Sequence, residues 1–120
     1  MNMAAGNKPC HVTAPRDICA VEEIVPGTGM AARVDGHQIA IFNTGSACYA
    51  IGNRDPFSGA NVLSRGILSE LDGRLVVASP VYKQHFCLRT GVCLEDDSVS
   101  VPVWAAEARD GRIVLECVQS

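Results

Sequence analysis

The sequence lacks several features that would point to particular classes of partner. Its 120 residues include 10 Lys or Arg and 13 Asp or Glu, a net charge of −3, and no run of basic residues occurs. Without a basic patch, the chain has no electrostatic attraction for nucleic acid or for an anionic membrane surface. No apolar run approaches the roughly 18–20 residues that cross a bilayer. We therefore expect neither nucleic acid nor a membrane as a partner.

The first residues printed also do not have the pattern of a secretory leader. Residues 1–8 have neither the basic start nor the apolar core of a signal peptide, so we expect a cytoplasmic, reducing location. No two cysteines have the C-x2–4-C spacing that directs two thiolates to one metal ion. We interpret them mainly as small buried side chains: Cys10, Cys19, Cys48, Cys87, Cys93 and Cys117. The alternative is a metal site built from His85, Cys87 and Cys93, which would still need a fourth ligand.

Short β-prone runs separated by turn dipeptides are abundant. Asp35-Gly36 and Asp110-Gly111 predict two-residue hairpins, because both residues of such a turn tolerate positive φ. Further strands are predicted at 47–51 and 75–78, and Pro102 indicates a strand start or an edge. The hairpins join the runs 30–34 with 38–42 and 101–105 with 112–118. The fold class is therefore all-β, a small antiparallel β-sandwich or barrel.

Helical signals are weak and the chain is short enough for one domain. Residues 18–23, capped by Asp17, and residues 66–71 can each form a helical turn, but neither run has the length of a confident helix. We predict a flexible N-terminal tail over 1–8 and a single domain over 9–118.

The region from Ile51 to Gly91 resembles the Rieske iron–sulfur domain, in which two loops supply C-x-H and C-P-x-H ligands to a [2Fe–2S] cluster. The resemblance lies in the frame around the ligands: LSRG at 63–66, Pro80, and FCLRTG at 86–91. It implies a Rieske-like fold with two loops in the place of the cluster-binding loops. The ligand positions of the family fall on Asn53, Asp55, Ser79 and Tyr82. None offers a thiolate or an imidazole, so we expect no cofactor in this chain.

One branch of the family is similar in these same departures: the small subunits of assimilatory NAD(P)H-dependent nitrite reductase. The shared segments are GNRDPFSGA at 52–60, SRGI at 64–67, SPVYKQHF at 79–86 and CLED at 93–96. The resemblance implies a large-subunit partner that carries FAD, an iron–sulfur cluster and sirohaem and reduces nitrite to ammonium in nitrate assimilation. Catalysis is then expected on that partner. An acid–base pair of Asp55 and His85 within this chain is the alternative.

Two expectations follow for the loops. Tyr82 is predicted to fill part of the volume that a cluster would occupy, while Asn53 and Asp55 hydrogen-bond backbone amides in Asx-type turns. The loops are also predicted to dock on the large subunit through aromatic and mostly basic side chains. These are Arg54, Phe57, Arg65, Tyr82, Lys83, Gln84, His85 and Arg89. The alternative for the loops is relic structure that is retained for stability. For the function of the whole chain, the alternatives are a stand-alone Rieske-type electron carrier and an interaction module of another oxidoreductase.

Overall fold

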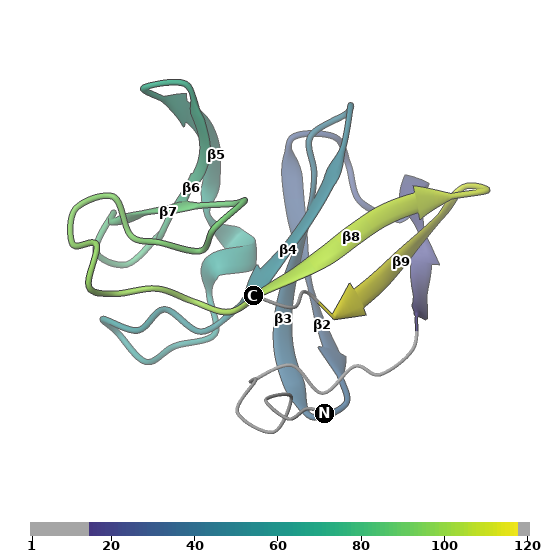
Figure 1. Ribbon diagram of the computed structural model, residues 1–120, viewed down its shortest axis with the longest axis horizontal. Coiled ribbons are helices and arrows are strands. Elements are labelled where there is room, and N and C mark those ends of the chain that lie inside the picture. Colours follow the sequence, from purple (N-terminus) through teal and green to yellow (C-terminus); the bar gives the residue numbers. More distant parts are fainter. Residues whose placement is uncertain (1–14, 118–120) are drawn as a thin grey trace, which may run out of the picture.

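The computed structural model describes residues 15–117 and shows two antiparallel sheets (Figure 1). The predicted tail at 1–8 and the ends of the predicted domain at 9–14 and 118 lie outside the described residues. The strands are β1 (Arg16–Ala20), β2 (Thr28–Val34), β3 (His37–Asn43), β4 (Cys48–Gly52), β5 (Ile67–Leu71), β6 (Arg74–Ala78), β7 (His85–Cys87), β8 (Val103–Arg109) and β9 (Arg112–Cys117). Two single-turn 3-10 helices are η2 (Val21–Glu23) and η3 (Leu63–Arg65).

The larger sheet has the strand order β1-β9-β8-β4-β3-β2. Its two predicted hairpins are confirmed, since β2 pairs with β3 and β8 pairs with β9 in antiparallel register. Asp35 and Gly36 have φ of 50° and 84°, and Asp110 and Gly111 have φ of 51° and 78°. These positive values are the ones that a two-residue hairpin turn of this kind requires. Pro102 immediately precedes β8, as predicted for a strand start.

The larger sheet curls so that its two edge strands approach each other. An ion pair joins Arg16 of β1, at one edge, to Asp35 in the β2–β3 turn at the other edge. An apolar cluster that includes Ile39, Ile41 and Trp104 is enclosed by this sheet. The predicted sandwich or barrel is therefore confirmed as a nearly closed antiparallel sheet.

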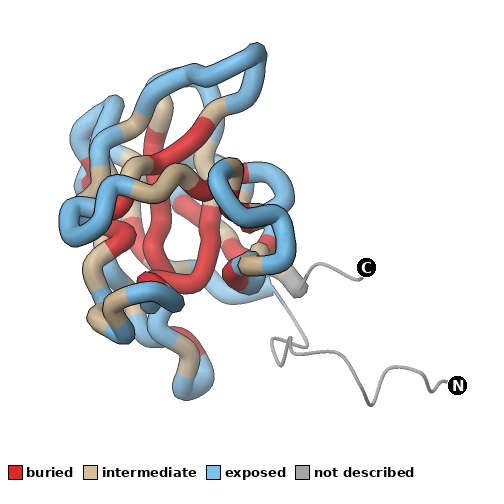
Figure 2. Tube along the Cα trace, turned by 90° about the vertical axis from the view of Figure 1, so that its left-hand side faces the viewer, coloured by how far each residue is buried: buried red, intermediate tan, exposed pale blue. Residues whose placement is uncertain are grey.

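The smaller sheet has the order β5-β6-β7, and a second apolar cluster lies between it and the larger sheet. Strand β3 contributes to both clusters: Ile39 and Ile41 belong to the first, Ala40 and Phe42 to the second. Because alternate side chains of a strand point to opposite faces, this continuous apolar run is buried on both sides. Figure 2 shows the resulting buried centre, with exposed segments concentrated in the turns and loops.

Both predicted helical turns need correction. Residues 16–20 form strand β1, which pairs with β9, and only Val21–Glu23 forms a 3-10 turn. The run 66–71 contains strand β5, paired with β6. Isolated helical turns of this length are unstable. In an antiparallel pair, by contrast, alternate residues of the new strand form backbone hydrogen bonds with the neighbouring strand, so these short runs are more stable as strands. Within residues 15–117, no helix is long and apolar enough to cross a membrane.

Candidate functional site

The first loop, residues 53–62, follows β4 and is anchored by Asn53. The side chain of Asn53 is buried, with 1% exposure, and its Oδ1 accepts a hydrogen bond of 2.7 Å from the Ser64 amide in η3. Its own backbone amide donates to the Gln38 carbonyl at 2.9 Å. The expected Asx-type turn is wrong for Asn53, because its acceptor serves an amide eleven residues along the chain. This side chain ties the loop to η3.

Asp55 lies at the centre of the same loop and is fully buried. Its Oδ1 accepts hydrogen bonds from the backbone amides of Phe57, at 2.8 Å, and Ser58, at 3.4 Å. The contact to the residue two positions on is the Asx-type turn expected from the sequence, which is confirmed here. The Asp55 carbonyl also accepts from the Gly59 amide at 2.7 Å. The aspartate thus organises the turn around its own backbone.

The second loop, residues 79–84, is joined to the first through Ser79. The buried Ser79 Oγ donates a hydrogen bond of 2.5 Å to Asp55 Oδ2. The Ser79 backbone closes its own loop, donating to the Gln84 carbonyl at 2.9 Å and accepting from the Lys83 amide at 3.0 Å. Two of the four predicted ligand positions, one in each loop, are therefore in direct contact.

Tyr82 does not fill the space between the loops. Its side chain is 58% exposed, so the predicted cluster-replacing role is wrong. The closed turn from Ser79 to Gln84, with Lys83 at φ 69°, carries Tyr82 outward. A solvent-facing phenol also keeps its hydroxyl hydrated without needing a buried partner. An aromatic contact is made instead between Phe57 of the first loop and the buried Phe86 of β7, whose ring centroids lie 6.3 Å apart.

The alternative sites predicted from His85 are not assembled. His85 Nδ1 lies 2.7 Å from Glu95 Oε2, and the His85 amide donates to Glu95 Oε1 at 2.8 Å. Asp55 is bonded to other groups, so the suggested acid–base pair is not formed. Over the described part of the chain, no group of three or more His, Cys, Asp or Glu side chains is placed to hold a metal ion. His85, Cys87 and Cys93 are therefore not brought together as such a group in the described chain.

Comparison with known proteins places this arrangement in a family. The model of the Rieske-like [2Fe-2S] domain matches residues 16–116. This chain belongs to the Rieske-like domain family. It is 45% identical, over 83% of its length and 94% of the relative's, to the nitrite reductase (NADH) small subunit of Salmonella typhimurium. A crystal structure described as a putative NADH-dependent nitrite reductase small subunit from Mycobacterium tuberculosis is 42% identical and superposes with a TM-score of 0.83, covering 92% of this chain and 100% of that one.

A third relative has a different architecture. The nitrite reductase [NAD(P)H] large subunit of Klebsiella oxytoca is 37% identical over 111 residues, which are 92% of this chain but only 12% of that protein. A Rieske-like domain of this kind therefore occurs both as a separate chain and within a longer polypeptide.

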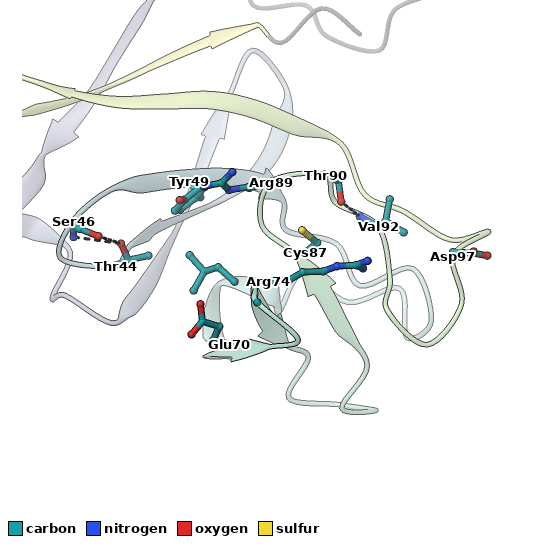
Figure 3. A pocket seen from close by; sticks show the side chains of 12 residues that line it. Thr44, Ser46, Tyr49, Glu70, Arg74, Cys87, Arg89, Thr90, Val92 and Asp97 are labelled. Carbon is teal, nitrogen blue, oxygen red and sulfur yellow. Dashed lines mark hydrogen bonds between the residues drawn. The ribbon is translucent and has the colours of Figure 1, made fainter.

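The residues predicted to dock divide into two groups in the Rieske-like domain. Arg54, Phe57, Tyr82 and Lys83 are exposed on the two loops, and Arg54 Nε donates to the Gly59 carbonyl at 3.3 Å. The remaining loop-side residues are Arg65 in η3, exposed, and Gln84 and His85, half-buried. Arg89 lies apart from them, after β7, where it lines a groove of about 880 Å³ (Figure 3).

The described cysteines include three thiols that ionise less readily than usual and one that ionises more readily. Burial raises the pKa of Cys19, Cys48 and Cys93, which suits their interpretation as core side chains. Burial also opposes ionisation of Cys87, yet hydrogen bonds from Thr90 and from the Arg89 amide, together with the Arg74 charge, hold the pKa of Cys87 below its ordinary value. The predictions for Cys10 and the Cys117 side chain fall outside what the structure describes.

Two side chains with contacts at these places were not singled out from the sequence. Glu95 clamps the start of β7 through His85, and Arg74 faces the same groove as Cys87 and Arg89. Glu95 belongs to the CLED segment, so its position within a shared motif was an available signal. Arg74 had none, because only the pairing of β6 with β7 brings it close to Cys87.

Proposed function

We propose that this chain is a non-catalytic small subunit of a cytoplasmic NAD(P)H-dependent nitrite reductase, and that it docks on the large subunit through its two loops. The observation that carries the proposal is the occurrence of the same domain as a separate small subunit and within a large-subunit polypeptide. In the large-subunit protein, the polypeptide itself holds this domain next to the rest of the large subunit. We propose that the separate chain reaches an equivalent position by binding to a large subunit.

The donor set at the predicted ligand positions does not fit a [2Fe–2S] cluster. Asn53, Asp55, Ser79 and Tyr82 offer amide, carboxylate, hydroxyl and phenol oxygens, whereas a Rieske centre takes two thiolates and two imidazoles. Asp55 and Ser79 already satisfy each other and nearby amides. We therefore propose that the Asp55–Ser79 hydrogen bond connects the loops directly and that no cluster bridges them.

The exposed side chains of the loops suit a docking surface. Phe57 and Val81 are 37% and 44% exposed, and Tyr82 lies beside Val81 with more than half of its surface in solvent. Arg54 and Lys83 add positive charge around these apolar groups. Interfaces commonly combine aromatic anchors with a charged rim, which affects the association rate and the choice of partner. The proposed partner surface is therefore apolar at its centre and acidic at its edge.

The experiment is an association measurement between this chain and its proposed partner, the nitrite reductase large subunit. Phe57→Ala combined with Lys83→Glu is expected to weaken the complex by about 100-fold, since an aromatic anchor and a charged contact are removed together. The matched control, Val25→Ala combined with Arg33→Glu, removes an exposed apolar residue and reverses an exposed charge near β2, and should leave the affinity unchanged. Equal affinities for both double variants would place the docking surface elsewhere.

Metal analysis separates the proposal from its main alternative. A stand-alone Rieske-type electron carrier purified under anaerobic conditions would be coloured and contain two irons per chain. The proposed subunit should be colourless, with iron far below one atom per chain, while retaining its affinity for the large subunit. Retention of another oxidoreductase, with no affinity for the nitrite reductase large subunit, would favour the interaction-module alternative.

A further inference from the structure

The outer edge of strand β5 is a feature of the smaller sheet that the proposed docking does not use. β5 ends the order β5-β6-β7, and within residues 15–117 its backbone pairs with β6 alone. The opposite edge of this sheet is covered, because the Cys87 amide of β7 donates to the Val92 carbonyl at 3.0 Å. In Figure 1 the β5–β6 hairpin projects upward, away from the loop at 53–62 in the lower left.

The backbone groups of Leu68 and Glu70 point outward from this edge. Antiparallel strands alternate between pairs that are hydrogen-bonded to each other and pairs whose backbone groups point away. The Leu75 carbonyl accepts from the Leu88 amide on the β7 side, so Leu75 and its partner Glu70 form a pair of the second kind. The pair of Leu68 with Val77 lies two residues further along and is of the same kind. Both residues of β5 therefore present an amide donor and a carbonyl acceptor to solvent.

Strand β5 lacks most of the features that keep sheet edges apart. Residues 67–71 contain no Lys, Arg or Pro, and their register with β6 has no bulge. Ile67 is 72% exposed and Leu71 is 37% exposed. These two side chains point to the same face, because they are four residues apart on a strand. An exposed, regular and partly apolar edge of this kind can accept a further strand through backbone hydrogen bonds.

We propose that β5 of one copy of this chain pairs antiparallel with β5 of a second copy, with Ser69 of the two copies opposite each other. In this register Glu70 of each copy is opposite Leu68 of the other, so the outward donors and acceptors of the two edges meet. Ile67 of each copy is opposite Leu71 of the other, which gives two apolar cross-strand pairs related by the twofold axis. Each exposed apolar side chain of the strand thereby gains an apolar partner.

The neighbouring registers that also match the outward backbone groups are less favourable. A register centred on Glu70 places the two Glu70 carboxylates directly opposite each other, and like charges in that position destabilise the pairing. A register centred on Leu68 places Ile67 opposite Ser69 and loses the apolar pairs. The sequence of β5 is therefore complementary to itself in the register centred on Ser69.

Charges at the ends of β5 support a second copy as the occupant. In the same register Asp72 is opposite Gly66 of the other copy, and the residue before Gly66 is Arg65. Asp72 and Arg65 are both exposed, so each end of the paired strands brings a carboxylate of one copy near a guanidinium of the other. Opposite charges on neighbouring strands favour the pairing. This complementarity occurs twice, because the two copies are related by a twofold axis.

The proposed dimer is weak and leaves the docking loops accessible. Pairing of two five-residue strands buries less than the about 1,200 Å² of a stable interface, and each copy carries a net charge of −3. We therefore expect a dissociation constant of about 100 µM. The loops at 53–62 and 79–84 take no part in the pairing, so the inference does not depend on the proposed docking.

Sedimentation equilibrium of the intact chain, from about 10 µM to about 1 mM, measures the self-association. Glu70→Pro removes an outward amide without removing a hydrogen bond to β6 and should weaken the dimer at least about tenfold. Glu70→Gln, its matched control, keeps the amide and should not weaken the dimer. Circular dichroism verifies that both variants are folded.

A second pair of variants changes side chains and leaves the backbone unaltered. Ile67→Lys replaces both apolar cross-strand pairs and should weaken the dimer about tenfold. Val25→Lys places the same charge at a residue that is 65% exposed and lies outside β5, and should leave the dissociation constant unchanged.

Hydrogen exchange followed by NMR locates the contact in the unaltered chain. Exchange of the Leu68 and Glu70 amides should slow about threefold between about 50 µM and about 1 mM, because they become hydrogen-bonded only in the dimer. The amides of β3, which are bonded within each copy, should show no comparable change.

Three results would overturn the proposal. The first is a monomer at about 1 mM, which excludes the expected affinity. The second is a dimer that persists unchanged in both Glu70→Pro and Ile67→Lys, which places the contact on another surface. The third is weaker binding of the large subunit in these variants without any change in self-association. In that case the edge of β5 would accept a strand of the large subunit and not a second copy.

Discussion

The centre of the larger sheet and the centre of the loop region are both buried, but different kinds of side chain fill them. Strand β3 places Ile39, Ile41 and Phe42 in two apolar clusters, and its neighbours on both sides pair with it along their length. In the loops at 53–62 and 79–84, the buried centre is the polar pair of Asp55 and Ser79. The larger sheet is therefore stabilised by apolar burial and by backbone hydrogen bonds between strands, whereas the loop region is stabilised by a few specific side-chain hydrogen bonds.

Because of this difference, we expect the two regions to lose their structure in different ways. Apolar burial is spread over many contacts, so its loss lowers the stability of the whole domain. A buried carboxylate depends on a small number of donors, and removing one of them leaves the others unsatisfied. The loop region should therefore open locally when a single partner is lost, while the larger sheet remains folded.

The largest expected effect comes from emptying the core of the larger sheet. Ile39→Ala removes a fully buried side chain at the centre of β3 and should lower the free energy of unfolding by about 4 kcal/mol. Urea unfolding monitored by circular dichroism measures this change. Ile67→Ala, on an edge strand where the side chain is 72% exposed, is the matched control and should change stability by less than about 0.5 kcal/mol. Similar losses in both variants would contradict the assignment of the core.

A smaller and more local effect is expected from Asp55→Ala. The variant leaves the Ser79 hydroxyl and the Phe57 amide without their acceptor, which should cost about 3 kcal/mol. Hydrogen exchange should accelerate at the loop amides of Phe57, Ser58 and Val81 well before it does in β3. A double-mutant cycle with Ser79→Ala should give a coupling of about 1.5 kcal/mol, because each side chain is the partner of the other.

Tyr82→Ala is the control for the loop region, since Tyr82 stands at the fourth predicted ligand position but is exposed. Its expected change is within about 0.5 kcal/mol. A loss as large as that of Asp55→Ala would mean that Tyr82 does pack between the loops. Uniform acceleration of exchange through both sheets in Asp55→Ala would remove the distinction between the two regions.

The same division explains what could be predicted from the sequence. Asp35-Gly36 and Asp110-Gly111 fix their hairpins by local turn chemistry, and the apolar run at 39–42 identifies the buried strand next to the first turn. The predicted helical turn at 66–71 was wrong because β5 depends on pairing with β6, a contact that its local composition does not encode. Tertiary pairing decides the conformation of such short runs.

The loops show the same limit at the level of single side chains. The Asx-type turn of Asp55 is a contact over two residues and could be predicted, whereas the contacts of Asn53 with Ser64 and of Asp55 with Ser79 join distant segments. The outward direction of Tyr82 follows from a turn closed by Ser79 and Gln84. The resemblance to the family's ligand frame therefore gave the candidate positions, but not which of them are in contact.

The smallest expected effect concerns the clamp between Glu95 and His85, which lies at the boundary between the second loop and β7. Burial opposes ionisation of Glu95, but hydrogen bonds from the His85 amide and ring lower its pKa below the ordinary value. A carboxylate whose pKa is lower in the folded chain stabilises the fold above its unfolded pKa, about 4.3, and this contribution is lost as the pH falls through the folded value. The carboxylate is about half exposed, so solvent screening limits the gain to about 0.5 kcal/mol.

Urea unfolding from pH 7 down to pH 3 measures this contribution by comparing the unaltered chain with Glu95→Gln. The variant keeps an acceptor for the His85 amide but loses the charge, so the stability difference should be present near neutral pH and shrink below about pH 4.3. Glu22→Gln is the control, because it removes an exposed carboxylate that makes no hydrogen bond or ion pair in the described chain. A difference for Glu95→Gln that grows on acidification would have the wrong sign for a lowered pKa. The contacts with His85 would then not stabilise the charged form of Glu95 in the folded chain.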